Sequence, residues 1–243
     1  MHLIVPLVVL LSFSGAAIAE APTTDVIERS GSLNDVFPAE QVAKLADVIS
    51  PDEIVRWKLF APASEAPHGV VVFVSPSASG APQPGWTDIL SKRNLIWIGA
   101  ENFGNEKLSA QRVLVALMGL ANVQKDFNVD GERIYIAGMS GGGRIASQTI
   151  TKFPTLFTGA LYIVGVDFWT KSDTSLLEHI RANRYVFLTG DGDFNRRETK
   201  RVYRKYQAAG ANRALLIDLA DFGHGYPDPQ HLDRALEFLD HEK

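Results

Sequence analysis

Cysteine is absent from the 243-residue sequence. The chain therefore cannot form a disulfide, a thiolate zinc site, a thiol nucleophile or a lipid-modified cysteine anchor. An excess of positive charge is also lacking, because 24 Lys and Arg stand against 28 Asp and Glu, for a formal net charge of −4. Binding to nucleic acid depends on basic side chains that neutralise phosphates. We therefore expect no nucleic-acid partner.

Charged residues are missing from the first 19 positions, which contain no Lys, Arg, Asp or Glu. Leu3 to Leu11 form an apolar run, and Ala17-Ile18-Ala19 has the A-x-A pattern of a cleavage site before Glu20. The run is shorter than the ~20 apolar residues that a membrane span needs. We predict a signal peptide over residues 1–19, export to the periplasm or the medium, and no stable membrane anchor after cleavage.

The remaining residues, 20–243, have the composition of a folded protein, since 46% of the sequence is hydrophobic and 21% is charged. Residues 20–53 are polar and interrupted by proline, which predicts an N-terminal arm with a short helix near 39–46. Short apolar runs predict strands at 53–60, 69–74, 95–100, 133–137, 160–166, 185–189 and 214–219. Helices are predicted at 109–127, 141–153, 175–183, 199–209 and 229–241.

Alternation of strands and helices is typical of βαβ units. The strand segments lack polar alternation, as expected for strands that are buried on both faces of a parallel sheet. We therefore predict a single α/β domain with a mostly parallel central sheet and helices on both faces. The connection from 166 to 185 is too short to hold a large lid domain.

The sequence Gly138-Met139-Ser140-Gly141-Gly142 is a G-x-S-x-G motif. It lies between a predicted strand and a predicted helix, which is the setting of a nucleophile elbow. Small neighbours would let Ser140 stand exposed on a strained turn. The N–H of Gly141 would lie at the helix N-terminus, where the dipole favours a developing oxyanion. We predict Ser140 as the nucleophile and Gly141 as an oxyanion donor.

An activated serine needs a base and an acid that orients the base. Two carboxylates, Asp191 and Asp193, follow the strand predicted at 185–189, and His224 follows the strand predicted at 214–219. All these side chains would then lie at the carboxyl ends of strands, where open α/β sheets bind ligands. The order serine, acid, histidine is that of the α/β-hydrolases.

The chain resembles the α/β-hydrolase superfamily, and within it small exported serine esterases related to polyhydroxyalkanoate depolymerases and feruloyl esterases. The resemblance extends from Val55 to the C-terminus and depends on Ser75–Gly80, Gly138–Gly142, Gly190–Asn195 and His224. It implies hydrolysis of a small-molecule or polymer-linked ester through an acyl-enzyme, without a cofactor. The spacing Gly190-x-x-Asp193 resembles the acid loop of the superfamily, which favours Asp193 over Asp191 as the triad acid.

The second oxyanion donor is less clearly marked. Many relatives have His-Gly after the third strand, whereas this chain has Ser75-Pro76, and proline has no N–H to donate. The resemblance therefore places the second donor at the Ser77 N–H, with Ala78 as the alternative.

Aromatic residues near the predicted strand ends are candidates for the substrate cleft, namely Phe168, Trp169 and Tyr226. The remaining histidines lie away from the predicted strand ends that carry the site, and we expect them to face solvent. They are His68, His179, His231 and His241.

Four other interpretations compete with that of a serine esterase. Residues 141–146 also satisfy G-x-G-x-x-A with Asp167 downstream, as in a dinucleotide-binding oxidoreductase, but the motif lies mid-chain. A non-catalytic binding module on the same fold and a peptidase of the prolyl-oligopeptidase type remain alternatives. No metal-binding motif such as H-E-x-x-H occurs, so we expect no metal. The sequence does not indicate an oligomeric state.

Overall fold

The computed structural model describes residues 25–169 and 174–240. The predicted signal peptide and His241 lie outside these ranges. Among the helices of the described ranges, none is long and apolar enough to cross a membrane.

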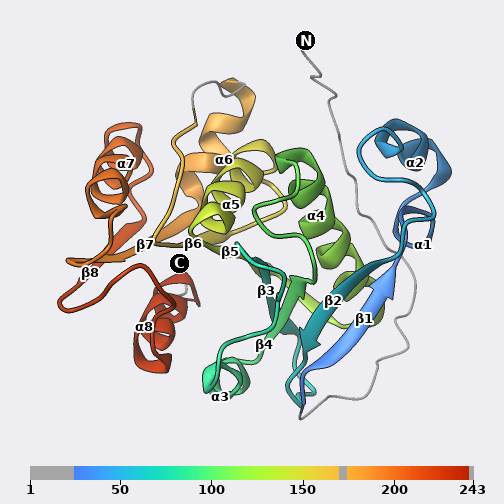
Figure 1. Cartoon of the computed structure of the whole chain (residues 1–243), viewed down its shortest axis with the longest axis horizontal. Helices are drawn as coiled ribbons and strands as arrows, with labels where there is room; N and C mark the ends of the chain where they lie inside the picture. Colours follow the sequence, from blue (N-terminus) through green and yellow to red (C-terminus); the bar gives the residue numbers. More distant parts are fainter. Residues whose placement is uncertain (1–24, 170–173, 241–243) are drawn as a thin grey trace.

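The described chain forms one eight-stranded sheet in the order β1-β2-β4-β3-β5-β6-β7-β8 (Figure 1). β2 runs antiparallel to both of its neighbours, and the pairs from β4 to β8 are parallel. The strands are β1 Ile27–Gly31, β2 Val55–Phe60, β3 His68–Val74, β4 Leu95–Ala100, β5 Val129–Met139, β6 Gly159–Ile163, β7 Arg184–Gly190 and β8 Ala214–Leu219. The predicted α/β class with a mostly parallel sheet is confirmed.

Helices cover both faces of this sheet (Figure 1). On one face, α4 and α5 pack with Val202 and Tyr206 of α7, and on the other face α3 packs with α8. The helices are α1 Leu33–Val36, α2 Ala39–Leu45, α3 Trp86–Lys92, α4 Ser109–Asp126, α5 Gly141–Lys152, α6 Leu177–Ala182, α7 Arg196–Ala208 and α8 Pro229–Asp240, with a 3₁₀ turn η1 at Thr174–Leu176.

The order of the strands determines where a site can form. β4 and β5 lie on opposite sides of β3, so the chain reverses its direction across the sheet at β3. The loops that follow β3 and β5 therefore lead to opposite sides of β3. Open α/β sheets bind ligands at the carboxyl ends of strands where the chain reverses in this way. Ser140 follows β5 and Ser75 follows β3, so both lie at this edge.

Two predictions about local structure need correction. Residues 20–53, predicted as an arm with one helix, also contain the strand β1 and the short helix α1, and α1 and α2 pack into the core. His68, predicted to face solvent, is only 7% exposed, because it begins the fully buried strand β3 and its ring packs edge-on against Phe127. His179 is exposed, and His231 is partly exposed beside Asp228.

Candidate active site

Ser140 occupies a strained turn between β5 and α5. Its φ of 54° and ψ of −119° lie in a region that residues other than glycine rarely adopt. The turn is held by the Ser140 N–H, which donates to the carbonyl of Ile163 at 2.8 Å. Non-glycine residues in such conformations cluster at functional sites.

The glycines of the motif allow α5 to approach the sheet closely. A Cβ atom on Gly138 would lie 2.3 Å from the carbonyl oxygen of Gly142. A Cβ atom on Gly142 would lie 1.9 Å from the carbonyl oxygen of Val74, at the end of β3. Both distances are far below van der Waals contact, so this packing excludes side chains at either position.

Ser140, His224 and Asp193 form one chain of hydrogen bonds. His224 Nε2 lies 2.8 Å from Ser140 Oγ, and His224 Nδ1 lies 2.8 Å from Asp193 Oδ1. With the proton on Nδ1, the imidazole donates a hydrogen bond to the carboxylate through Nδ1 and accepts one from the serine hydroxyl at Nε2. This is the geometry in which a histidine can remove the proton from a serine.

Asp193 is embedded in polar contacts, whereas Asp191 is exposed. The Asp193 side chain has 0% relative exposure. Thr189 Oγ1 donates to Oδ2 at 2.7 Å, and the Asn195 N–H donates to Oδ1 at 2.9 Å. The structure therefore brings Asp193, and not Asp191, to His224.

The two predicted oxyanion donors differ in their surroundings. Gly141 is the first residue of α5, so its N–H has no partner within the helix. The Ser77 N–H already donates to Ser75 Oγ at 3.2 Å, so it would have to leave that hydroxyl to reach an oxyanion. The Ser77 assignment, with Ala78 as its alternative, stays a prediction.

A buried arginine forms hydrogen bonds with two loops near the predicted oxyanion site, the loop after β3 and the loop before α4. Arg112 of α4 is 5% exposed and donates from Nη2 to the Ser75 carbonyl at 2.8 Å and from Nη1 to Asn105 Oδ1 at 3.1 Å. The Asn105 N–H in turn donates to the Pro76 carbonyl at 3.0 Å. Burial lowers the pKa of Arg112, and no described carboxylate forms an ion pair with it. In the sequence, the signal for this residue is an arginine beside the apolar face of a predicted helix.

The predicted substrate-binding aromatics have mainly structural contacts. Phe168 and Trp169 stack on each other at 4.3 Å and pack against Tyr206 of α7. Tyr226 packs against Trp86, and burial raises its pKa while hydrogen bonds to Ser75 and Ser77 oppose the rise. A role in substrate contact stays a prediction for all three.

Phe194 was missed by the sequence analysis. It follows Asp193 directly, is 76% exposed, and its ring stacks on the imidazole of His224 with the centroids 3.9 Å apart. An apolar residue immediately after a candidate acid was the available signal. The exposed ring covers one face of the imidazole.

The dinucleotide-binding interpretation finds no support at Asp167. Arg144 Nη1 donates to its Oδ1 at 2.7 Å, and Gln148 Nε2 donates to its Oδ2 at 3.0 Å. Both carboxylate oxygens are therefore engaged within the protein. No group of three or more His, Asp or Glu that could hold a metal ion occurs among the described residues.

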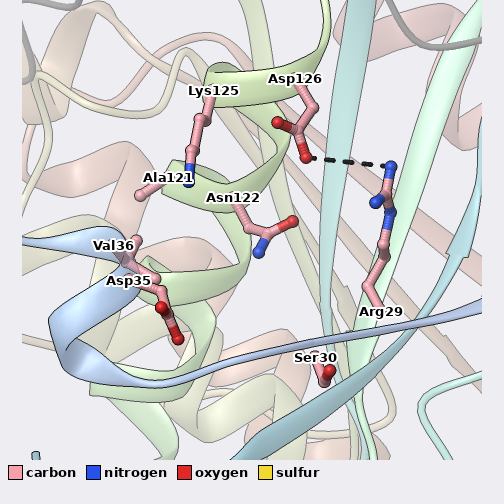
Figure 2. A pocket seen from close by; sticks show the side chains of 8 residues that line it. All are labelled: Arg29, Ser30, Asp35, Val36, Ala121, Asn122, Lys125 and Asp126. Carbon is pink, nitrogen blue, oxygen red and sulfur yellow. Dashed lines mark ion pairs between the residues drawn. The ribbon is translucent and has the colours of Figure 1, made fainter.

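Two cavities are lined by residues outside the Ser140 site. One has a volume of 300 Å³ between β1, α1 and the end of α4, where Arg29 faces Asp126 at 3.8 Å (Figure 2). The other, of 680 Å³, adjoins the start of β5 and β7, where Arg133 is paired with Asp240 at 3.0 Å.

These features define a class of protein. A sheet in which only the second strand is reversed, with a serine on a strained turn after β5, an acid after β7 and a histidine after β8, is the α/β-hydrolase fold. The chain has this fold.

Comparisons with known proteins are consistent with that class. The model described as "Prolyl oligopeptidase family" matches residues 114–185, which include Ser140. No protein with a curated description matches the chain significantly.

Several solved structures are similar at low sequence identity. EstE1, a thermostable carboxylesterase from a metagenomic library, is 16% identical with a TM-score of 0.64, over 91% of this chain and 92% of the esterase. A ferulic acid esterase is 15% identical with a TM-score of 0.60, over 87% and 95%. The acylaminoacyl peptidase of Pyrococcus horikoshii is 14% identical with a TM-score of 0.61, over 87% of this chain but 40% of the peptidase.

Proposed function

We propose that this protein is a serine hydrolase that cleaves carboxylic esters. The observation that carries the proposal is the continuous chain of hydrogen bonds from Asp193 through His224 to Ser140, with 2.8 Å on each side of the imidazole. The similarity of the fold to esterases and peptidases supports the coarser function of a hydrolase.

In the proposed mechanism, Ser140 Oγ attacks the ester carbonyl while His224 Nε2 accepts its proton. The Gly141 N–H donates to the oxygen that becomes negatively charged. His224 then gives the proton to the leaving alcohol, and an acyl group remains on Ser140. A water molecule, deprotonated by His224, attacks the acyl-enzyme, and His224 returns this proton to Ser140 Oγ as the acid is released. In both steps Asp193 accepts a hydrogen bond from the Nδ1–H of His224 and stabilises the imidazolium.

A peptidase is the second candidate, because the matching family model is that of prolyl oligopeptidases. The acyl-enzyme route serves both substrates, so the geometry of the triad does not separate them. The chain spans 92% and 95% of the two esterases and 40% of the peptidase. The choice between the two candidates is made by the substrate.

The test is labelling of purified protein by a fluorophosphonate probe, followed by identification of the labelled residue. We expect label on Ser140 and none in Ser140→Ala, whose loss of 4-nitrophenyl acetate hydrolysis should be on the order of 10³-fold or more. Absence of label in the folded wild type would leave only a non-catalytic binding module. Parallel assays with an aminoacyl-4-nitroanilide separate the two candidates, since a peptidase would cleave the anilide efficiently.

A further inference from the structure

A basic hollow lies next to the proposed active site. It has a volume of 360 Å³ and is lined by Asp193, Phe194, Arg196, Arg197, Lys200 and Arg204. Phe194 connects it to the reaction centre, because the same ring that lines the hollow stacks on His224 at 3.9 Å. The other lining residues of α7 extend the hollow away from Ser140 along that helix.

Two of the four basic residues, Arg196 and Lys200, share the single carboxylate of Asp218. Asp218 of β8 accepts from Arg196 Nε at 2.9 Å and from Lys200 Nζ at 2.7 Å. These interactions raise the pKa of Arg196 and lower that of Asp218, so both stay charged at neutral pH. Asp193, the acidic member of the lining, is engaged by His224.

Arg197 and Arg204 are not neutralised in this way. Both are exposed, and neither forms an ion pair with another residue of the described chain. The neighbouring Glu198 does not compensate them, because its carboxylate pairs with Arg144 and Arg201. The hollow therefore keeps two positive charges on a molecule whose formal net charge is −4.

The spacing of these arginines gives them a common direction. Residues i and i+7 lie two turns apart on the same side of a helix, about 10 Å along its axis. A guanidinium binds a carboxylate, sulfate or phosphate through two parallel N–H donors. The exposed ring of Phe194 supplies an apolar surface between these donors and His224.

We propose that this hollow is a subsite for a negatively charged part of the substrate. The inference depends on the proposed function and refines it: the preferred esters carry an anionic group, bound by Arg197 and Arg204, several bonds from the scissile carbonyl. Phe194 contacts the apolar segment between the two. A neutral ester would use the reaction centre without these contacts. The weakly acidic net charge of the whole chain gives no sign of this local excess of positive charge.

The first test compares similar esters with and without a carboxylate. The acetyl ester of 4-hydroxybenzoate is compared with that of its methyl ester, which places the charge on the alcohol side. Mono-4-nitrophenyl glutarate is compared with 4-nitrophenyl butyrate, which places it on the acyl side. We expect a higher kcat/KM for the anionic member of at least one pair. That advantage should shrink between about 50 mM and about 500 mM NaCl, because salt screens exposed charges.

The second test uses Arg197→Gln, Arg204→Gln and the double variant. Exposed ion pairs contribute modestly, so we expect each substitution to reduce the anionic-to-neutral ratio of kcat/KM by about two- to fivefold and the double variant by about tenfold. Lys44→Gln is the matched control. It removes one exposed positive charge from α2, at the far end of the molecule from α7 (Figure 1), and should leave the ratio unchanged.

Binding without turnover separates this proposal from the proposed function. In the Ser140→Ala background, equilibrium binding of 4-acetoxybenzoate should weaken about tenfold when both arginines are replaced. If neutral esters are hydrolysed but the ratios of the arginine variants equal that of Lys44→Gln, the subsite is wrong and the esterase stands. If no ester is hydrolysed while the arginines still control binding of the anion, the esterase is wrong and the anion site stands. Equal binding of 4-acetoxybenzoate by Ser140→Ala and by Ser140→Ala with both arginines replaced would overturn the subsite directly.

Discussion

At the scale of single residues, burial distinguishes two carboxylates that are two positions apart. Asp193 contacts His224 and is shielded from water, whereas Asp191 is exposed. An amide at position 193 could donate to Nδ1 and would favour the wrong tautomer of the imidazole. We expect Asp193→Asn to reduce kcat for 4-nitrophenyl acetate by about 10³- to 10⁴-fold, and Asp191→Asn by less than about twofold. Steady-state kinetics of the two variants side by side decide the assignment, and the opposite ranking would transfer the role to Asp191.

Arg112 acts on the site through the loops that it holds. In Arg112→Met an unbranched apolar side chain remains, but the Ser75 carbonyl loses its donor, which costs about 1–3 kcal/mol for a buried group. Removing a buried, unpaired charge offsets part of that cost. We expect the variant to fold and to show a kcat about tenfold lower, with KM within about twofold.

Arg112→Lys provides the control for this positioning role. Lysine keeps the positive charge, but its single ammonium cannot reproduce the fork that contacts both Ser75 and Asn105. Its kcat should lie between those of the wild type and Arg112→Met. Circular dichroism checks that all three proteins are folded, and an unchanged kcat in Arg112→Met would show that the arginine only fills space.

At the scale of elements, the apolar runs predicted seven strands, and six of them belong to the parallel part of the sheet, where strands are buried on both faces. β1 did not meet this criterion, since Glu28 and Ser30 are exposed and the strand lies at the edge of the sheet. α3 was not predicted either, because its seven residues are too few to show a helical period and follow a segment rich in glycine and proline. Short elements at the edge are stabilised by tertiary contacts, which local pattern does not record.

The contact between α5 and β3 permits a prediction about the nucleophile elbow. A methyl group on Gly142 would meet the Val74 carbonyl at 1.9 Å, so α5 would have to move away from the sheet. Overpacking typically costs about 1–3 kcal/mol, and backbone atoms yield less readily than side chains. We expect Gly142→Ala to lower the free energy of unfolding by at least about 2 kcal/mol, measured by urea denaturation. Gly131→Ala is the matched control: a Cβ there has no atom within 4 Å, so the change should stay within about 0.5 kcal/mol.

At the scale of the whole molecule, chain order and strand ends sufficed to predict that Ser140, Asp193 and His224 lie together. Ser140 and His224 are 84 residues apart, yet each follows a recognisable strand. The contact between Arg112 and Ser75 joins α4 to the loop after β3, and the stacking of Phe194 on His224 joins two loops. Both depend on side-chain packing across the fold, which neither periodicity nor motif spacing encodes. The basic hollow needed the structure for the same reason.

The stability of the whole molecule should depend on pH through His68. This side chain begins β3. Burial lowers its pKa, a hydrogen bond to Asn94 partly opposes the shift, and the charge of Arg133 adds to the lowering. The fold therefore favours the neutral imidazole, whereas the unfolded chain binds a proton near pH ~6.5. His68 thus stabilises the native state above about pH 6.5, and this contribution is lost as the pH falls through that value toward the lower folded pKa.

His68→Phe tests this linkage, because phenylalanine can keep the edge-on contact with Phe127 but cannot titrate. The free energy of unfolding, measured by urea denaturation at about pH 7.5 and about pH 5, should fall less steeply in His68→Phe than in the wild type. His179→Gln, at an exposed position on α6, should parallel the wild type. Equal losses in all three proteins would mean that His68 is protonated within the native fold without penalty, and that the acid sensitivity of the molecule arises from its carboxylates instead.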